Sequence, residues 1–119
     1  MGYYTYFTME ACDTTTNGPL SAEKEKEICK RLWEISKDAV YEGDCFYDCL
    51  NDSLKWYDHQ DNMIALSKEF PEVMFMLEGE GEERDDNWRL FVQNGEWEIV
   101  NAIIVWNAPS YEKFRNMGF

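Results

Sequence analysis

Residues 88–101 read Trp88-Arg89-Leu90-Phe91-Val92-Gln93-Asn94-Gly95-Glu96-Trp97-Glu98-Ile99-Val100-Asn101. Asn94 and Gly95 separate two alternating runs, and both residue types tolerate the positive φ angles of a type I′ turn, so the stretch predicts a β-hairpin with a two-residue loop. That loop sets the register: Val92 lies opposite Trp97, Leu90 opposite Ile99, and Trp88 opposite Asn101. We expect one face of the hairpin to be core and the other to meet water; the core face carries Trp88, Leu90, Val92, Trp97 and Ile99, and the wet face carries Arg89, Gln93, Glu96 and Glu98.

The segments on either side of the hairpin extend the predicted sheet. Residues 73–77 are apolar at every position, which is typical of an interior strand with both faces covered. Residues 101–106 continue the last strand of the hairpin until Pro109 and Ser110 end it. The sequence therefore predicts three strands in succession in its second half.

The first half predicts two further strands and two helices. Aromatic and β-branched residues at 3–9 favour a strand, and residues 53–57 have a short alternating pattern. Ser21 can cap a helix over 22–36, and Pro71 ends a second helix over 60–70. Residues 38–52 predict no regular element, because Gly, Asp and Asn interrupt every pattern there.

The predicted order is β-α-β-α-β-β-β in a single domain over residues 1–119, with no repeat and no linker. Two helices most simply cover one face of a mixed or antiparallel sheet of about five strands. This is an α+β fold, an α/β sandwich of the ferredoxin-like kind.

The charge balance is the most unusual property of the whole chain. Lys and Arg number 11 against 24 Asp and Glu, a formal net charge of -13. Such a chain is repelled by phosphate backbones, so direct nucleic-acid binding is disfavoured and a basic protein surface is the natural partner. The alternative is that the charge only keeps the protein soluble.

Nothing in the chain predicts a membrane or secreted setting. The longest apolar stretch, residues 102–106, is far shorter than the roughly 20 residues that cross a bilayer, and the N-terminus lacks a signal peptide pattern. We therefore expect a cytoplasmic protein with reduced thiols, and the irregular spacing of the cysteines disfavours a zinc site. These cysteines are Cys12, Cys29, Cys45 and Cys49.

Catalytic residues are hard to find, and we expect no enzyme and no cofactor. His59 is the one histidine, and beside Asp58 it would form half of a dyad, although a solvated histidine at a turn is the simpler interpretation. The chain has no nucleophile elbow, phosphate loop or dinucleotide-binding turn.

Acidic residues gather in the segment that leads into the hairpin. We select as candidate partner-binding residues Glu80, Glu82, Glu83, Asp85, Asp86 and the aromatic anchor Trp88. The alternatives are a solvated acidic loop and a site for a hard cation such as calcium or magnesium. A second acidic stretch would enlarge the negative surface if both lay on one side; it contains Asp38, Glu42, Asp44, Asp48, Asp52, Asp58 and Asp61.

The second half of the chain resembles a known group of proteins. The pattern comprises Lys55-Trp56-Tyr57-Asp58-His59, Phe70-Pro71, Gly79-Glu80-Gly81-Glu82-Glu83, Trp88 and Asn94-Gly95. It is similar to small uncharacterised proteins of phages and plasmids that have a YubB-type ferredoxin-like domain, over about residues 55–106. The resemblance implies a mobile-element setting and supplies no catalytic residues.

Charge and resemblance together predict a function. Small acidic proteins of mobile elements are often inhibitors of host defence, such as anti-CRISPR or anti-restriction proteins that mimic DNA. We expect a non-enzymatic inhibitor of a basic nucleic-acid-handling protein. The alternative is an accessory domain that binds a cation or a small ligand.

Overall fold

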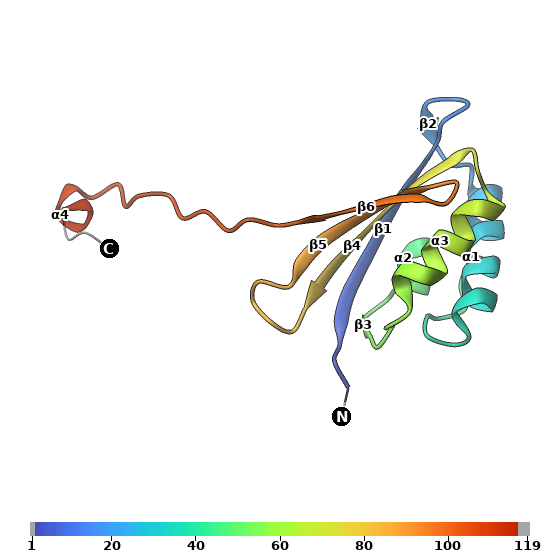
Figure 1. Ribbon diagram of the computed structural model, residues 1–119, viewed down its shortest axis with the longest axis horizontal. Helices are drawn as coiled ribbons and strands as arrows, with labels where there is room; N and C mark the ends of the chain where they lie inside the picture. The colour runs from blue at the N-terminus through green and yellow to red at the C-terminus, as the bar shows by residue number, and fades with distance from the viewer. Residues whose placement is uncertain (1, 117–119) are drawn as a thin grey trace.

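An antiparallel sheet is the framework of the computed structural model, which describes residues 2–116 (Figure 1). Its strands lie in the order β2-β1-β4-β5-β6, and β3 pairs with the other end of β1. The protein is therefore α+β, with a six-stranded sheet. In chain order, the elements are β1 (Thr5–Asp13), β2 (Gly18–Pro19), α1 (Ala22–Ser36), α2 (Phe46–Cys49), β3 (Ser53–Leu54), α3 (His59–Glu69), β4 (Val73–Gly81), β5 (Asn87–Gln93), β6 (Glu96–Asn101) and α4 (Glu112–Arg115).

The ferredoxin-like order that we expected is not confirmed. The helices α1, α2 and α3 all come between β1 and β4, which pair along their whole length. After β4 the chain continues as a meander through β5 and β6. In a split β-α-β fold the helices would instead belong to separate crossovers.

Several predicted elements are confirmed, with changed boundaries. The helix over 22–36 has the expected limits, and the Ser21 hydroxyl accepts a hydrogen bond from the Lys24 N–H at 3.1 Å. The second predicted helix begins one residue early, at His59, and ends at Glu69. The strand predicted over 53–57 contains only Ser53 and Leu54, because Trp56 turns inward and the chain enters α3. The segment that predicted no element contains α2.

The core lies between the sheet and one layer of helices (Figure 1). Alternate residues of β1 and β4 point into it, among them Phe7, Phe75 and Leu77. From the helices, Ile28, Leu32 and Leu66 complete it. Burying a large apolar side chain of this kind contributes about 1.5–3 kcal/mol, so this layer provides most of the driving force for folding.

The hairpin has the predicted register, but not the predicted burial. Val92 pairs with Trp97, Leu90 with Ile99, and Trp88 with Asn101, and Asn94 and Gly95 both have positive φ. Leu90 and Val92 are buried, whereas all six residues of β6 are exposed. The strand β6 is exposed because it lies at the edge of the sheet, beyond α3, which contacts β4 and β5.

The chain leaves the body of the protein after β6. The strand ends at Asn101, whereas we expected it to continue to Trp106, and residues 102–111, which we call the arm, run away from the sheet toward α4 (Figure 1). The radius of gyration is 17.7 Å, above the roughly 13–14 Å of a compact chain of this length. Among the described residues, no helix is long and apolar enough to cross a membrane.

Candidate partner-binding surface

The acidic loop, residues 82–86, is the turn that joins β4 to β5. Its ends are closed by a hydrogen bond from the Gly81 N–H to the Asp86 carbonyl at 2.8 Å. Within it, the Asp86 N–H donates to the Glu83 carbonyl at 3.1 Å. The loop therefore has its own backbone structure and presents its side chains from a defined position at one end of the sheet.

Two tyrosines at the start of the chain hold the acidic loop against β1. The Tyr3 hydroxyl donates to the Asp86 carboxylate at 2.7 Å and accepts from the Glu83 N–H at 3.0 Å. The Tyr4 N–H donates to the Glu82 carboxylate at 3.0 Å. The bond from Glu83 by itself lowers the pKa of Tyr3, but the bond to Asp86, burial and the nearby negative charges outweigh it, so the pKa is raised. Tyr3 consequently stays protonated and keeps donating to Asp86 at neutral pH.

The candidate acids lack cationic partners. In the part of the chain that the structure describes, the ion pairs join Lys24 to Glu72, Arg31 to Glu34 and Glu69, and Arg89 to Glu78. None of them involves the acidic loop or Glu80. Arg84, the one cation within the loop, lies over the ring of Trp106 at 5.1 Å from its centroid. The loop carboxylates are thus an uncompensated concentration of negative charge.

Exposed tyrosines lie beside the carboxylates of the acidic loop, and the sequence patterns did not predict them as part of the site. Tyr4 and Tyr6 are 41% and 58% exposed, and Tyr6 lies between Glu80 of β4 and Ser53 of β3. Tyr57 is 62% exposed, and its hydroxyl accepts from the Tyr3 N–H at 2.8 Å. We interpreted the first run of tyrosines only as a strand signal; the alternation of exposed residues in β1 is what indicates an accessible aromatic surface.

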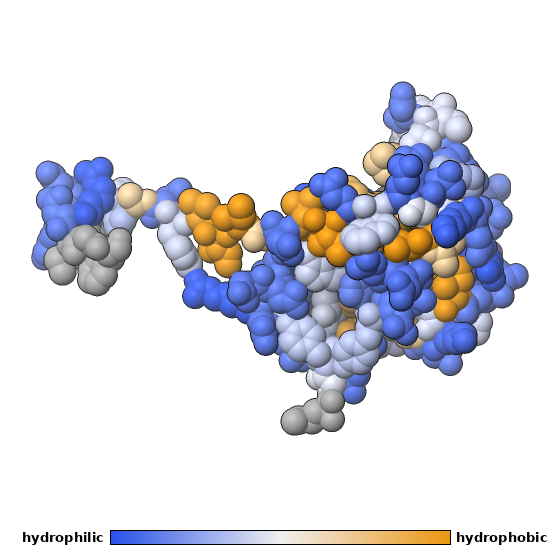
Figure 2. Space-filling view, in the orientation of Figure 1, coloured by the Kyte–Doolittle hydropathy of each residue, from blue (hydrophilic) through white to orange (hydrophobic). Residues whose placement is uncertain are grey.

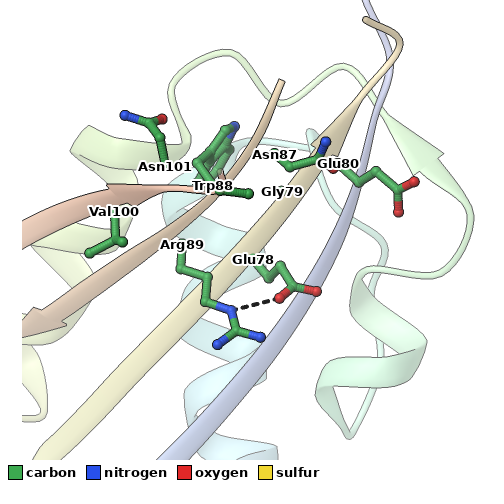
Figure 3. A pocket seen from close by; sticks show the side chains of 9 residues that line it. Glu78, Gly79, Glu80, Asn87, Trp88, Arg89, Val100 and Asn101 are labelled. Carbon is green, nitrogen blue, oxygen red and sulfur yellow. Dashed lines mark hydrogen bonds and ion pairs between the residues drawn. The ribbon is translucent and has the colours of Figure 1, made fainter. Parts of the chain in front are cut away.

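Trp88 has a different place from the one we expected for an anchor. Its ring stacks on His59, with centroids 4.7 Å apart, and meets the edge of Phe7 at 6.1 Å. It lines a hollow of about 370 Å³ between β4, β5 and β6, together with Gly79 and the ion-paired Glu78 and Arg89 (Figure 3). Trp88 is therefore half-buried in this packing, and less accessible than the exposed aromatic anchor that we expected.

The second acidic stretch only partly joins the first. Glu42, Asp44 and Asp48 line a separate hollow of about 750 Å³ with α1, where Lys26 and Lys30 also lie. Asp52 adjoins Ser53, which shares a smaller hollow with Tyr4, Tyr6, Gly81 and Glu82. The structure therefore brings Ser53, the neighbour of Asp52, to the acidic loop and places Glu42, Asp44 and Asp48 beside lysines.

The other candidate chemistries find little support in the geometry. Nδ1 of His59 lies 2.9 Å from the Trp56 carbonyl, and the Asp58 carboxylate makes no contact with the ring, so no dyad is assembled. Within residues 2–116, no three His, Cys, Asp or Glu side chains are gathered as a metal site would require.

Two of the four thiols form a buried pair between α1 and α2. Cys29 and Cys49 are inaccessible to solvent and are not joined by a disulfide. The interaction with Cys49, followed by burial, raises the pKa of the Cys29 thiol well above its usual range. Cys29 is thus a neutral core residue at neutral pH.

Comparisons with protein families, curated proteins and solved structures find no match to this chain. The similarity to YubB-type domains therefore stays a prediction.

Proposed function

We propose that this chain is a non-enzymatic acidic binding protein that engages the basic surface of a nucleic-acid-handling protein in the cytoplasm and blocks it. The observation that carries the proposal is the uncompensated charge of the acidic loop and Glu80 on a turn held by Tyr3 and Tyr4. The resemblance to phage and plasmid proteins makes the target class host defence, as for an anti-CRISPR or anti-restriction protein.

Rigidity is what separates this surface from a solvated acidic tail. Clustered carboxylates repel one another, so a flexible segment would disperse them. Here the hydrogen bonds of Tyr3 and Tyr4 fix the loop before any partner arrives. A preformed site loses less conformational entropy on binding, and its field steers a basic partner toward it.

The neighbouring tyrosines supply apolar surface that a partner can bury, which the carboxylates alone do not. Tyr is enriched at interfaces because it buries a large ring and keeps a polar tip. Tyr6 and Tyr57 both present more than half of their surface beside the loop. We propose that they contact the partner around its basic groups, in the role first assigned to Trp88.

A paired charge-reversal experiment tests the proposal. Glu83 and Asp85 have exposed carboxylates that make no hydrogen bond or ion pair among the described residues, so the variant E83K/D85K changes charge without removing a structural contact. The control variant E23K/E27K makes the same change in net charge on α1, at two exposed carboxylates that form no hydrogen bond or ion pair among the described residues. Figure 1 shows α1 on the other side of the molecule from the acidic loop. Each form is used to capture proteins from a bacterial lysate at low and at high salt.

We expect the wild type and the control to retain a basic protein that salt and duplex DNA both release, and E83K/D85K to lose it. Retention by the loop variant would overturn the proposal, as would an empty low-salt capture. For the alternative function, calcium or magnesium would raise the melting temperature of the wild type and leave that of E83K/D85K unchanged.

A further inference from the structure

The outer edge of the sheet at β6 is open. The Ala102 N–H donates to the Asn87 carbonyl at 2.9 Å, and bonded residues alternate along an antiparallel pair. Even-numbered residues of β6 therefore bond to β5. Trp97, Ile99 and Asn101 direct their N–H and C=O groups away from the sheet, where no strand lies among the described residues.

Soluble proteins normally protect such an edge, and this one has charged residues only near its start, Glu96 and Glu98. Charged residues, proline or a bulge prevent edge-to-edge pairing in most sheets. Here β6 is regular, and no charged residue occurs between Ile99 and Tyr111. The exposed side chains are apolar instead: Trp97 (50%), Ile99 (37%), Val100 (46%), Ile103 (85%), Ile104 (48%), Val105 (79%) and Trp106 (76%).

These side chains follow one another along β6 and the first part of the arm, on both faces of the strand, and together they are called the apolar strip. Figure 2 shows hydrophobic colour along β6 and again on the first part of the arm, beside a mostly hydrophilic body. Together they offer on the order of 600 Å² of side-chain surface per copy. A standard interface buries roughly 800 Å² per partner, so the strip with its backbone has the size that a stable contact needs.

The charge of the chain selects the occupant of this strip. The basic partner proposed for the acidic loop binds carboxylates. The strip has only two, Glu96 and Glu98 at its start, so it is a poor site for that partner. A second copy carries the same net charge of -13, so it can approach only where charge is absent. The part of the strip that follows Glu98 meets that condition, and an antiparallel pairing of two identical edges is self-complementary about a two-fold axis.

We propose that β6 and the first part of the arm pair antiparallel with the same segment of a second copy, making one continuous sheet across a dimer. With the axis near Asn101, Ile99 lies opposite Ile103 of the second copy and Trp97 opposite its Val105. Glu98 then faces Ile104, so no carboxylate is opposed to another. The acidic loop touches the end of the seam through Arg84, which lies over Trp106, whereas its carboxylates are not part of the pairing and remain open for the proposed partner.

Sedimentation of the full chain over a range of concentrations tests the dimer. We expect a mass that doubles as concentration rises, and a dissociation constant at least tenfold weaker for I99K/I103K, which puts lysines into the seam. S110K, in the arm but outside the paired region, should dimerise like the wild type. Unfolding of the dilute variants, followed by circular dichroism, verifies that each is folded.

A pair of proline variants separates strand pairing from general apolar contact. I103P removes an N–H group that faces the second copy, whereas I104P removes one that faces the other way, and both lose one isoleucine. I103P should weaken the dimer more. A wild-type chain that stays monomeric at every concentration would overturn the proposal, as would equal effects of the two prolines. E83K/D85K should dimerise normally, so the two proposals can fail separately.

Discussion

The ring of Trp88 lies directly over the backbone of Gly79, its cross-strand partner: a Cβ built on Gly79 would stand 2.2 Å from Cζ2 of the indole. Gly79 lies on the core-facing side of the central strand β4. Because it has no side chain, the indole of Trp88 fills the space there. Trp88 in turn packs against His59 and Phe7. The absence of a side chain at Gly79 thus lets the indole of Trp88 pack against β4, His59 and Phe7.

Replacing Gly79 by alanine should destabilise the fold by about 1–3 kcal/mol, because the indole must move out of its packing. Urea unfolding followed by tryptophan fluorescence measures the change. Gly18→Ala is the matched control, since its added Cβ would meet nothing closer than 3.7 Å. Equal stability of the two variants would contradict this account of the packing.

Replacing Ser67 by alanine should cost about 1–2 kcal/mol, because it leaves the N–H at the tip of the hairpin without an acceptor. The buried Ser67 hydroxyl accepts from the Gly95 N–H at 2.9 Å and donates to the Ile64 carbonyl at 2.7 Å. Amide hydrogen exchange at Gly95 should speed up along with the loss of stability. Ser53→Ala, which removes a hydroxyl without a hydrogen bond in the described structure, should change neither.

The pair of Arg31 and Glu69 should make stability depend on pH in the acid range. The hydrogen bond from the Arg31 guanidinium holds the pKa of Glu69 below its usual value of 4.5. A carboxyl with a lowered folded pKa stabilises the fold above the unfolded pKa and loses that contribution as pH falls through the folded pKa. The stability gap between wild type and E69Q should therefore be present at pH 6 and shrink below about pH 4.5. The gap should be small, because both partners are more than a third exposed; a constant gap would exclude the linkage.

The thiols should react in the order of their exposure. Cys12 is exposed, Cys45 is partly buried, and Cys29 and Cys49 are buried. A thiol reagent added to the native protein should modify Cys12 first, and should reach Cys29 and Cys49 only after urea unfolding. Peptide mapping assigns each site, and the C12S variant should lose the fast phase. Modification of Cys29 at the rate of Cys12 would show that the helical layer opens readily.

Local chemistry explains which parts of the fold were predictable from the sequence. The Asn94–Gly95 turn and the Ser21 cap each act within a few residues, and the hairpin register and the limits of α1 followed from them. The burial of β6 did not follow, because it depends on how far α3 reaches across the sheet. Alternation identifies the inward face of a strand, but does not tell whether another layer covers it.

The candidate site shows the same division. The acids of the β4–β5 turn were visible as a run, and the structure places them in one loop. The tie from Tyr3 to Asp86 joins opposite ends of the chain, and no local pattern predicts it. The half-buried position of Trp88 could not be predicted from local patterns, because it depends on the space that Gly79 leaves on the neighbouring strand.

The long pairing of β1 with β4 has a consequence for how the protein folds. Thr5 pairs with Gly81 and Asp13 with Val73, so the whole helical layer lies between the paired residues along the chain. Closing such a large loop delays the contact, and proteins rich in distant contacts fold slowly. We infer that β4, β5 and β6 pair with one another early in folding, and that β1 pairs with β4 later. Its open edges are then exposed during synthesis, and refolding yield should fall with protein concentration.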